Sequence, residues 1–250
     1  MYEQEMAHKN LILRILVGSH LYGTNTENSD KDYLGIFIPD KDYVMGIKRV
    51  EQVEDRTNPS DSERRNTKAD VDTVLYSLPK FIHLASGNNP NIVEVFFAPK
   101  RNIVFCNEYG QKLLDSYYWF ISKKLKHTFC GYAYSQKQKL LTKQPIGGRT
   151  EYMEKFGYDV KFASHLIRLL TEGLQLLVEE KLTLPLTNNN LVRDIKLGKY
   201  PLAHVLSEAE RYEQLVESAY VSSKLPNTPD LEQINKLQIE LLQSWWDSRK

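Results

Sequence analysis

The stretch Gly18–Asp32 (GSHLYGTNTENSDKD) decides how this chain of 250 residues is interpreted. The apolar run Leu11–Val17 (LILRILV) leads into it, and a second run, Asp32–Ile38 (DYLGIFI), leads out of it. Short runs rich in aliphatic and aromatic residues, bounded by glycine and polar residues, predict β-strands. We therefore expect two strands that are connected by a turn at Gly18, a short helix and a polar loop.

Two aspartates at the start of the second strand indicate a cation site. Asp30 and Asp32 are two residues apart, so their side chains share one face of a strand. Neighbouring carboxylates repel each other unless a cation lies between them. Mg2+ takes oxygen ligands and usually keeps substrate phosphates in its shell. Gly18 and Ser19 would supply the other half of such a site, because glycine lets backbone N–H groups approach an anion and serine adds a hydroxyl donor.

A third carboxylate is available in the strand-like run Ala69–Tyr76, where Asp70 and Asp72 again share a face. Three carboxylates complete the set that a two-metal site needs, in which one cation activates the attacking hydroxyl and the other stabilises the triphosphate. The alternative for each of these two aspartates is a solvent-facing position at the beginning of a strand.

These residues resemble the signature of the nucleotidyltransferase superfamily typified by DNA polymerase beta: Gly-Ser, a short spacer, Asp-x-Asp on a strand, and a third acidic residue on a later strand. The wider pattern Gly-Ser-x-x-Tyr-Gly, then Ser-Asp-x-Asp-Tyr-x-Gly, looks like its RlaP branch of predicted nucleotidyltransferases associated with RNA repair and RNA ligases. The phrase Asp72–Phe81 (DTVLYSLPKF) resembles the third-carboxylate strand of that family. The resemblance therefore favours Asp72 over Asp70 and leaves open whether Asp70 also contributes.

The resemblance implies an α+β fold, in which a polymerase-beta-like nucleotidyltransferase palm with a mixed sheet and flanking helices precedes a C-terminal helical domain. The pattern agrees, because Lys48–Asp55 reads as an edge strand and Ser77–Ser86 as a helix with a serine N-cap. From about Glu108 onward the periodicity is helical. We place a boundary near Ser122–His127, which divides the chain into a catalytic domain, 1–125, and a helical domain, 126–250.

The segment Gly157–Glu180 is the strongest predicted helix. Lys161, His165, Arg168 and Glu172 follow one another along one face of it. Cations in a row on a helix face would suit a triphosphate or an RNA backbone, and family members resemble this segment around the same three basic residues. The alternatives are a solvated charged face and, for His165, a structural histidine with satisfied hydrogen bonds.

Four further segments need an interpretation. Lys126–Lys139 mixes cations and aromatic rings, which fits either single-stranded RNA or a helix core. Arg56–Lys68 contains no aliphatic or aromatic residue, so we expect a surface loop or a lid over the phosphates. Glu94 is expected at the rim of a half-exposed helix, with pairing to an arginine as the alternative. The amphipathic segment Leu231–Trp246 is expected to dock onto the helical bundle.

The composition is that of an ordinary globular protein. The chain has 33 Lys and Arg against 32 Asp and Glu, a formal net charge of +1, so RNA contacts would have to come from a local patch. No run approaches the length of a membrane span, and the acidic start of the chain argues against a signal peptide. Cys106 and Cys130 show no metal or redox spacing, as expected for reduced thiols in a cytoplasmic protein.

Together, the residues and the resemblance predict a metal-dependent nucleotidyltransferase that moves a nucleoside monophosphate from an NTP to a hydroxyl group and releases pyrophosphate. The expected acceptor is the hydroxyl of an RNA 3′ end. Mg2+ or Mn2+ would be the cofactor and an RNA ligase a partner. The assigned residues are Asp30, Asp32 and Asp72 for the metal ions, and Gly18, Ser19, Lys161, His165 and Arg168 for the nucleotide. The alternatives are transfer to a protein or small molecule, and a catalytically silent nucleotide- or RNA-binding partner of a ligase.

Overall fold

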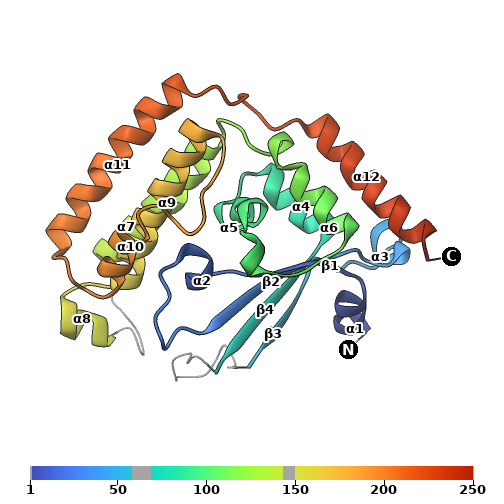
Figure 1. Ribbon diagram of the computed structural model, residues 1–250, viewed down its shortest axis with the longest axis horizontal. Coiled ribbons are helices and arrows are strands. Elements are labelled where there is room, and N and C mark those ends of the chain that lie inside the picture. Colours follow the sequence, from blue (N-terminus) through green and yellow to red (C-terminus); the bar gives the residue numbers. More distant parts are fainter. Residues whose placement is uncertain (1, 58–68, 143–149, 250) are drawn as a thin grey trace.

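The protein is described from a computed structural model that covers residues 2–57, 69–142 and 150–249. Its centre is a five-stranded sheet in the order β3-β4-β2-β1-β5 (Figure 1). The strands are β1 (Leu11–Leu16), β2 (Lys31–Phe37), β3 (Gln52–Arg56), β4 (Val71–Ser77) and β5 (Ile103–Cys106).

The sheet is mixed because one pair of neighbouring strands is parallel. Strands β2 and β4 run in the same direction, whereas β1 pairs with β2 and with β5, and β3 with β4, in antiparallel fashion. In the parallel pair Asp32 lies opposite Asp72 and Leu34 opposite Val74. This register sets two aspartates from distant parts of the sequence side by side at the same end of the sheet.

Helices cover both faces of the sheet. On one face lie α4 (Leu78–Ser86), α5 (Pro90–Val93), the 3-10 turn Glu94–Phe97 and α6 (Glu108–Asp115). On the other lie α1 (Tyr2–Lys9) and α3 (Lys41–Met45), where Met6 and Tyr43 pack with Phe37 and Leu75.

Helix α4 begins as its sequence predicts. The Ser77 hydroxyl accepts a hydrogen bond from the backbone N–H of Lys80, and Pro79 occupies the first turn.

The helical bundle has its own core beside the sheet (Figure 1). Its helices are α7 (Leu125–Thr142), α8 (Thr150–Phe156), α9 (Val160–Glu179), α10 (Asn189–Lys196) and α11 (Leu202–Ser222). Helix α9 is central, because α7, α10 and α11 all pack against it. The apolar side chains of α9, such as Leu166 and Leu170, are therefore buried.

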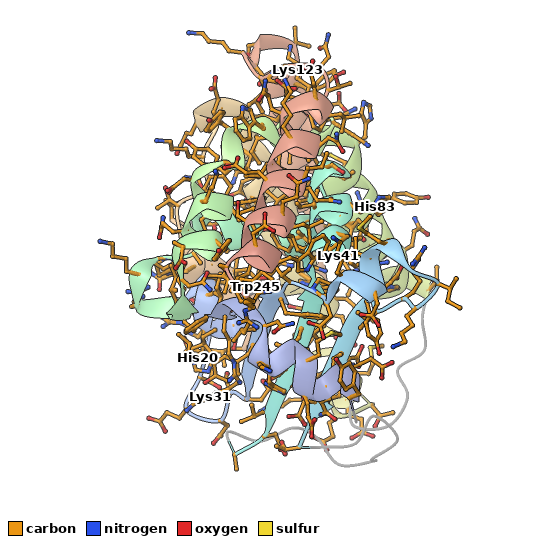
Figure 2. All side chains as sticks on the ribbon, turned by 90° about the vertical axis from the view of Figure 1, so that its right-hand side faces the viewer. His20, Lys31, Lys41, His83, Lys123 and Trp245 are labelled. Atoms are coloured by element: carbon orange, nitrogen blue, oxygen red, sulfur yellow. The ribbon has the colours of Figure 1, made fainter. Side chains whose placement is uncertain are left out.

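The last helix, α12 (Leu231–Asp247), corrects one expectation. It does not dock onto the bundle. It crosses to the sheet and packs against α4 and α6, where Leu237 and Leu241 join the core of the sheet. Trp245, near the end of the helix, belongs to the same core (Figure 2). The Trp246 indole N–H donates to the Pro39 carbonyl at 3.0 Å. The amphipathic pattern identified the buried face correctly but carries no information about which surface covers it.

The predicted fold class is confirmed: a mixed sheet with flanking helices precedes a C-terminal helical region. Strand β5 was missed, because a run of four residues is too short to show a period. The division at residue 125 stays a prediction. The loop or lid predicted for Arg56–Lys68 lies outside the described part of the chain from residue 58 onward, and Arg56 is the last residue of β3. In the described part of the chain, no helix is long and apolar enough to cross a membrane.

Candidate active site

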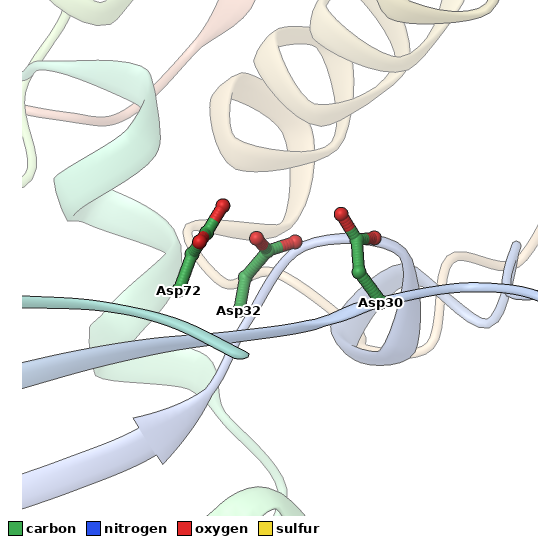
Figure 3. Close-up of side chains that lie close together, drawn as sticks. All are labelled: Asp30, Asp32 and Asp72. Carbon is green, nitrogen blue, oxygen red and sulfur yellow. The ribbon is translucent and has the colours of Figure 1, made fainter. Parts of the chain in front are cut away.

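Three aspartates meet at the end of the sheet. Asp30, Asp32 and Asp72 each offer one carboxylate oxygen, and these three oxygens lie within 4.8 Å of one another (Figure 3). The arrangement follows from two features of the backbone: the Asp-x-Asp spacing places Asp30 and Asp32 together, and the parallel register places Asp72 opposite Asp32. The structure thus brings together the three acidic residues that the sequence singled out.

The donor set fits a hard divalent cation. All three groups offer oxygen, which is the ligand type of Mg2+ and Mn2+. Burial, followed by the charges of Asp30 and Asp72, raises the pKa of Asp32 from 3.8 to about 6. A carboxylate whose charged form is disfavoured by its neighbours is stabilised when a cation enters, so the electrostatics of the site favour metal binding.

Gly18 is required at its position by both its backbone and its surroundings. Its φ of +64° lies in the left-handed region, and a Cβ there would collide with Oδ2 of Asp32. The one-turn helix α2 (Ser19–Tyr22) starts directly after it. Only glycine lets this turn approach the aspartates so closely.

A cavity of about 510 Å3 opens beside the aspartates, between the sheet and the bundle. One wall is formed by Gly18, Ser19, Asp30 and Asp32. The facing wall carries basic side chains from three helices of the bundle: Lys139 of α7, Lys161, His165 and Arg168 of α9, and Lys196 of α10. An acidic wall opposite a basic wall is suited to a metal-bound polyphosphate.

Lys196 is the functional candidate that sequence reasoning missed. Its ammonium group donates to the Thr24 carbonyl at 3.4 Å. Burial, followed by the charge of Lys161, lowers its pKa, whereas Asp30 and Asp32 act in the opposite direction. Lys196 therefore lies within electrostatic reach of both walls. Its place at the end of a short amphipathic helix gave no local signal of this position.

The four charged residues that share one face of α9 differ in their exposure, so the alternative of a fully solvated charged face is not found. Lys161 and His165 are exposed to the cavity, whereas Arg168 is 2% exposed and Glu172 is fully buried. The stripe becomes buried because α7, α10 and α11 enclose the middle of α9. Arg168 lines the cavity but is paired with Glu94 and Glu172, so its assignment to the nucleotide stays a prediction.

Glu94 is also placed differently from its expected rim position. It is 3% exposed, and its carboxylate receives Nη1 of Arg168 at 3.1 Å and the Tyr22 hydroxyl at 2.6 Å. The alternative interpretation, pairing with an arginine, is the one found. No period or motif in the sequence shows that residue 94 and residue 168 meet.

Asp70 is not a member of the acidic group. It is 4% exposed, and its Oδ1 accepts a hydrogen bond from the Thr57 hydroxyl at 3.2 Å. It lies one residue before β4, whereas Asp72 lies within the strand. The preference for Asp72 over Asp70 agrees with this geometry.

Two lysines of the predicted RNA-binding segment in α7 face α11 and form ion pairs. Lys126 pairs with Glu217 at 2.7 Å and Lys137 with Glu213 at 3.1 Å. Tyr132 and Tyr134 remain exposed. An RNA-binding surface on this helix therefore stays a prediction, and the charges of two of its lysines are already compensated by glutamates of α11.

Comparisons with known proteins identify the family of this chain. A family described as "RNA repair pathway DNA polymerase beta family", RlaP, matches residues 2–239. An uncharacterized 38.9 kDa protein of the nrdC-mobD intergenic region of Enterobacteria phage T4 is 31% identical over 131 residues, which are 51% of this chain and 38% of the phage protein. A nucleotidyltransferase-like protein from Exiguobacterium sibiricum 255-15 aligns over 98% of this chain and 72% of its own, with 14% identity and a TM-score of 0.31. Because the family match extends over nearly the whole sequence, this chain belongs to the RlaP family, a nucleotidyltransferase-like branch of the DNA polymerase beta group.

Proposed function

We propose that this protein is a metal-dependent nucleotidyltransferase that transfers a nucleoside monophosphate from an NTP to a hydroxyl acceptor and releases pyrophosphate. One observation carries the proposal: three carboxylate oxygens within 4.8 Å of one another lie at the edge of a cavity whose opposite wall is basic. Phosphoryl-type transfer depends on positioning and charge stabilisation more than on covalent chemistry by the protein. Such a cavity supplies both.

The residues divide into two groups in this proposal. Asp30, Asp32 and Asp72 would hold the divalent cations, which when bound neutralise the developing negative charge and orient the two reacting oxygens. On the opposite wall, Lys161 and Lys196 would neutralise the negative charge of the triphosphate.

The turn beside the aspartates has its own role in the proposal. The N–H groups and hydroxyl of Gly18 and Ser19 would donate to the β- and γ-phosphates, because this turn lines the cavity next to Asp32.

An RNA 3′ end is the acceptor that the family description favours, because the description refers to RNA repair. An RNA ligase would then be a functional partner, since a ligase consumes repaired ends. The formal net charge of +1 is also compatible with a protein or small-molecule acceptor, and that remains the second candidate. The product that carries the label distinguishes the two.

The test is label transfer from each α-labelled NTP with Mg2+ or Mn2+ and a panel of broken RNAs. We expect labelled RNA from the wild-type protein, and a loss of several orders of magnitude in Asp30→Asn and in Asp72→Asn. Asp115→Asn is the matched control, because Asp115 is an exposed aspartate of α6 that hydrogen-bonds Gln111. Undiminished transfer by the two site variants would exclude the metal assignment, and label on protein alone would exclude RNA as the acceptor.

A further inference from the structure

A buried charged network lies behind the nucleotide cavity. Arg168 Nη1 donates to Glu94 at 3.1 Å and to both oxygens of Glu172 at 3.0 Å. The Tyr22 hydroxyl donates to the same Glu94 at 2.6 Å, and the Tyr22 ring lies 4.2 Å from the guanidinium carbon. Two carboxylates and an aromatic face therefore hold the guanidinium in one orientation.

The network reaches the cavity through one contact. Nη2 of Arg168 lies 2.6 Å from Nε2 of His165, whose ring lines the cavity. A guanidinium carries only donors and keeps its proton in proteins, so Nε2 must be the acceptor in this hydrogen bond. An imidazole whose Nε2 accepts has its proton on Nδ1 and carries no charge.

We propose that Arg168 is a positioning residue that holds His165 as a neutral imidazole with its proton on Nδ1, so that His165 serves the nucleotide site as a hydrogen-bond donor and not as a cation. The proposal rests on the nucleotidyltransferase function proposed above only for the identity of the ligand. The two residues of α9 then have different roles: Lys161 contributes a positive charge, whereas His165 contributes an oriented, uncharged hydrogen-bond donor. The fixed orientation of Arg168 sets the plane of the ring.

The first test observes the histidine directly in the metal-free protein without nucleotide. Histidine-selective 15N NMR distinguishes a pyridine-like Nε2 with a protonated Nδ1 from the opposite tautomer and from the imidazolium. The His165 signals are assigned by their loss in His165→Gln. We expect the Nδ1-protonated form near neutral pH, and either of the other two forms as the dominant species would overturn the proposal.

Two variants test whether the arginine causes this state. Arg168→Lys keeps the buried charge but removes the planar fork, so we expect the His165 signals to shift toward a mixture of forms. Tyr22→Phe is the matched control, because it removes one hydrogen bond to Glu94 and leaves the Arg168–His165 contact intact. Unchanged His165 signals in a folded Arg168→Lys protein would assign the tautomer to another cause and overturn the positioning role.

The second test asks by kinetics whether an uncharged donor is sufficient. His165→Asn keeps an uncharged N–H close to the Nδ1 position, whereas His165→Leu has neither a donor nor a charge. We expect the asparagine variant to retain KM for the NTP within about tenfold and the leucine variant to lose more than that. The reverse order would overturn the donor role. If the wild-type protein transfers no nucleotide, the proposed function fails, but the NMR result still decides the tautomer.

Discussion

At the scale of single residues, the site is an arrangement of like charges on each of two facing walls. Asp32 shows the cost, because burial and two neighbouring carboxylates raise its pKa to about 6. On the other side of the cavity, burial and Lys161 lower the pKa of Lys196. On each wall, burial and like charges disfavour the charged form of a side chain. A metal-bound polyphosphate would offset both effects, because its cation faces the aspartates and its phosphates face the lysines.

Replacing Asp32 should therefore stabilise the metal-free protein while removing its metal binding. The pKa of Asp32 is higher in the folded protein than its ordinary value of 3.8, so ionisation disfavours the folded state. This penalty is absent at about pH 4 and complete above about pH 6. Near neutral pH we expect Asp32→Asn to raise the melting temperature by about 2–4 °C, with allowance for partial exposure of the carboxylate. Thermal unfolding with and without Mg2+ measures both effects, and a lower melting temperature near neutral pH would contradict the prediction.

Lys196 offers a test of the basic wall. Lys196→Met should raise KM for the NTP by about tenfold or more, because it removes a partly desolvated charge next to the triphosphate. Lys199→Met is the control, since Lys199 is an exposed lysine nearby that pairs with Asp194 at 2.8 Å. Steady-state kinetics of the two variants should differ clearly. Equal KM values would remove Lys196 from the nucleotide site.

At the scale of elements, the parallel pairing of β2 with β4 and the turn before α2 build the site together. The register places Asp32 opposite Asp72, and the left-handed backbone of Gly18 brings the turn against Asp32. Neither element makes a site alone. A shift of one residue in the pairing would turn every side chain of a strand to the other face of the sheet.

Gly18→Ala tests this close approach. A methyl group at φ +64° both strains the backbone and collides with the Asp32 carboxylate, so we expect a loss of about 1–3 kcal/mol in unfolding free energy and a severe loss of transfer activity. Gly131→Ala is the matched control, because a Cβ at this exposed position in α7 meets no atom within 4 Å. That control should gain about 0.5–1 kcal/mol. Chemical denaturation and the label-transfer assay check both variants, and two equal outcomes would contradict the role given to Gly18.

At the scale of the whole molecule, two hydrophobic cores are joined across the cavity. The bundle contributes α9, the sheet side contributes the turn at Glu94, and the Arg168–Glu94 pair connects them. After the chain has passed through the bundle, helix α12 packs on α4 and α6, on the face of the sheet opposite α1 and α3 (Figure 1). The nucleotide cavity lies where these two parts face each other, so their relative position sets its width.

The buried network makes this connection dependent on pH. Burial raises the pKa of Glu94 above its ordinary 4.5, so ionisation of Glu94 costs the folded protein stability as pH rises above that value. Glutamine cannot ionise, so Glu94→Gln should flatten this dependence of stability on pH. Arg168→Met should instead lose about 3–5 kcal/mol, because it leaves two carboxylates buried without their cation. Denaturation at several pH values decides this, and parallel pH curves for wild type and Glu94→Gln would refute it.

Local patterns were sufficient for the elements next to the site and for the choice of its three aspartates. Short apolar runs predicted the strands on either side of Gly18–Asp32, and the Ser77 cap predicted the start of α4. They were insufficient for Glu94, Arg168 and Lys196, because these residues differ from ordinary charged surface residues only in what surrounds them. The destination of α12 was missed for the same reason: amphipathicity defines a buried face but not its partner.

The sequence by itself determined that this protein carries Gly-Ser, Asp-x-Asp and a later strand aspartate, since spacing along a strand is a local property. Only the tertiary structure decided that Asp72 lies opposite Asp32, that Lys196 faces them and that Arg168 turns inward to His165. The physical reason is that strand register and helix packing depend on contacts between residues far apart in the chain. No local period records those contacts.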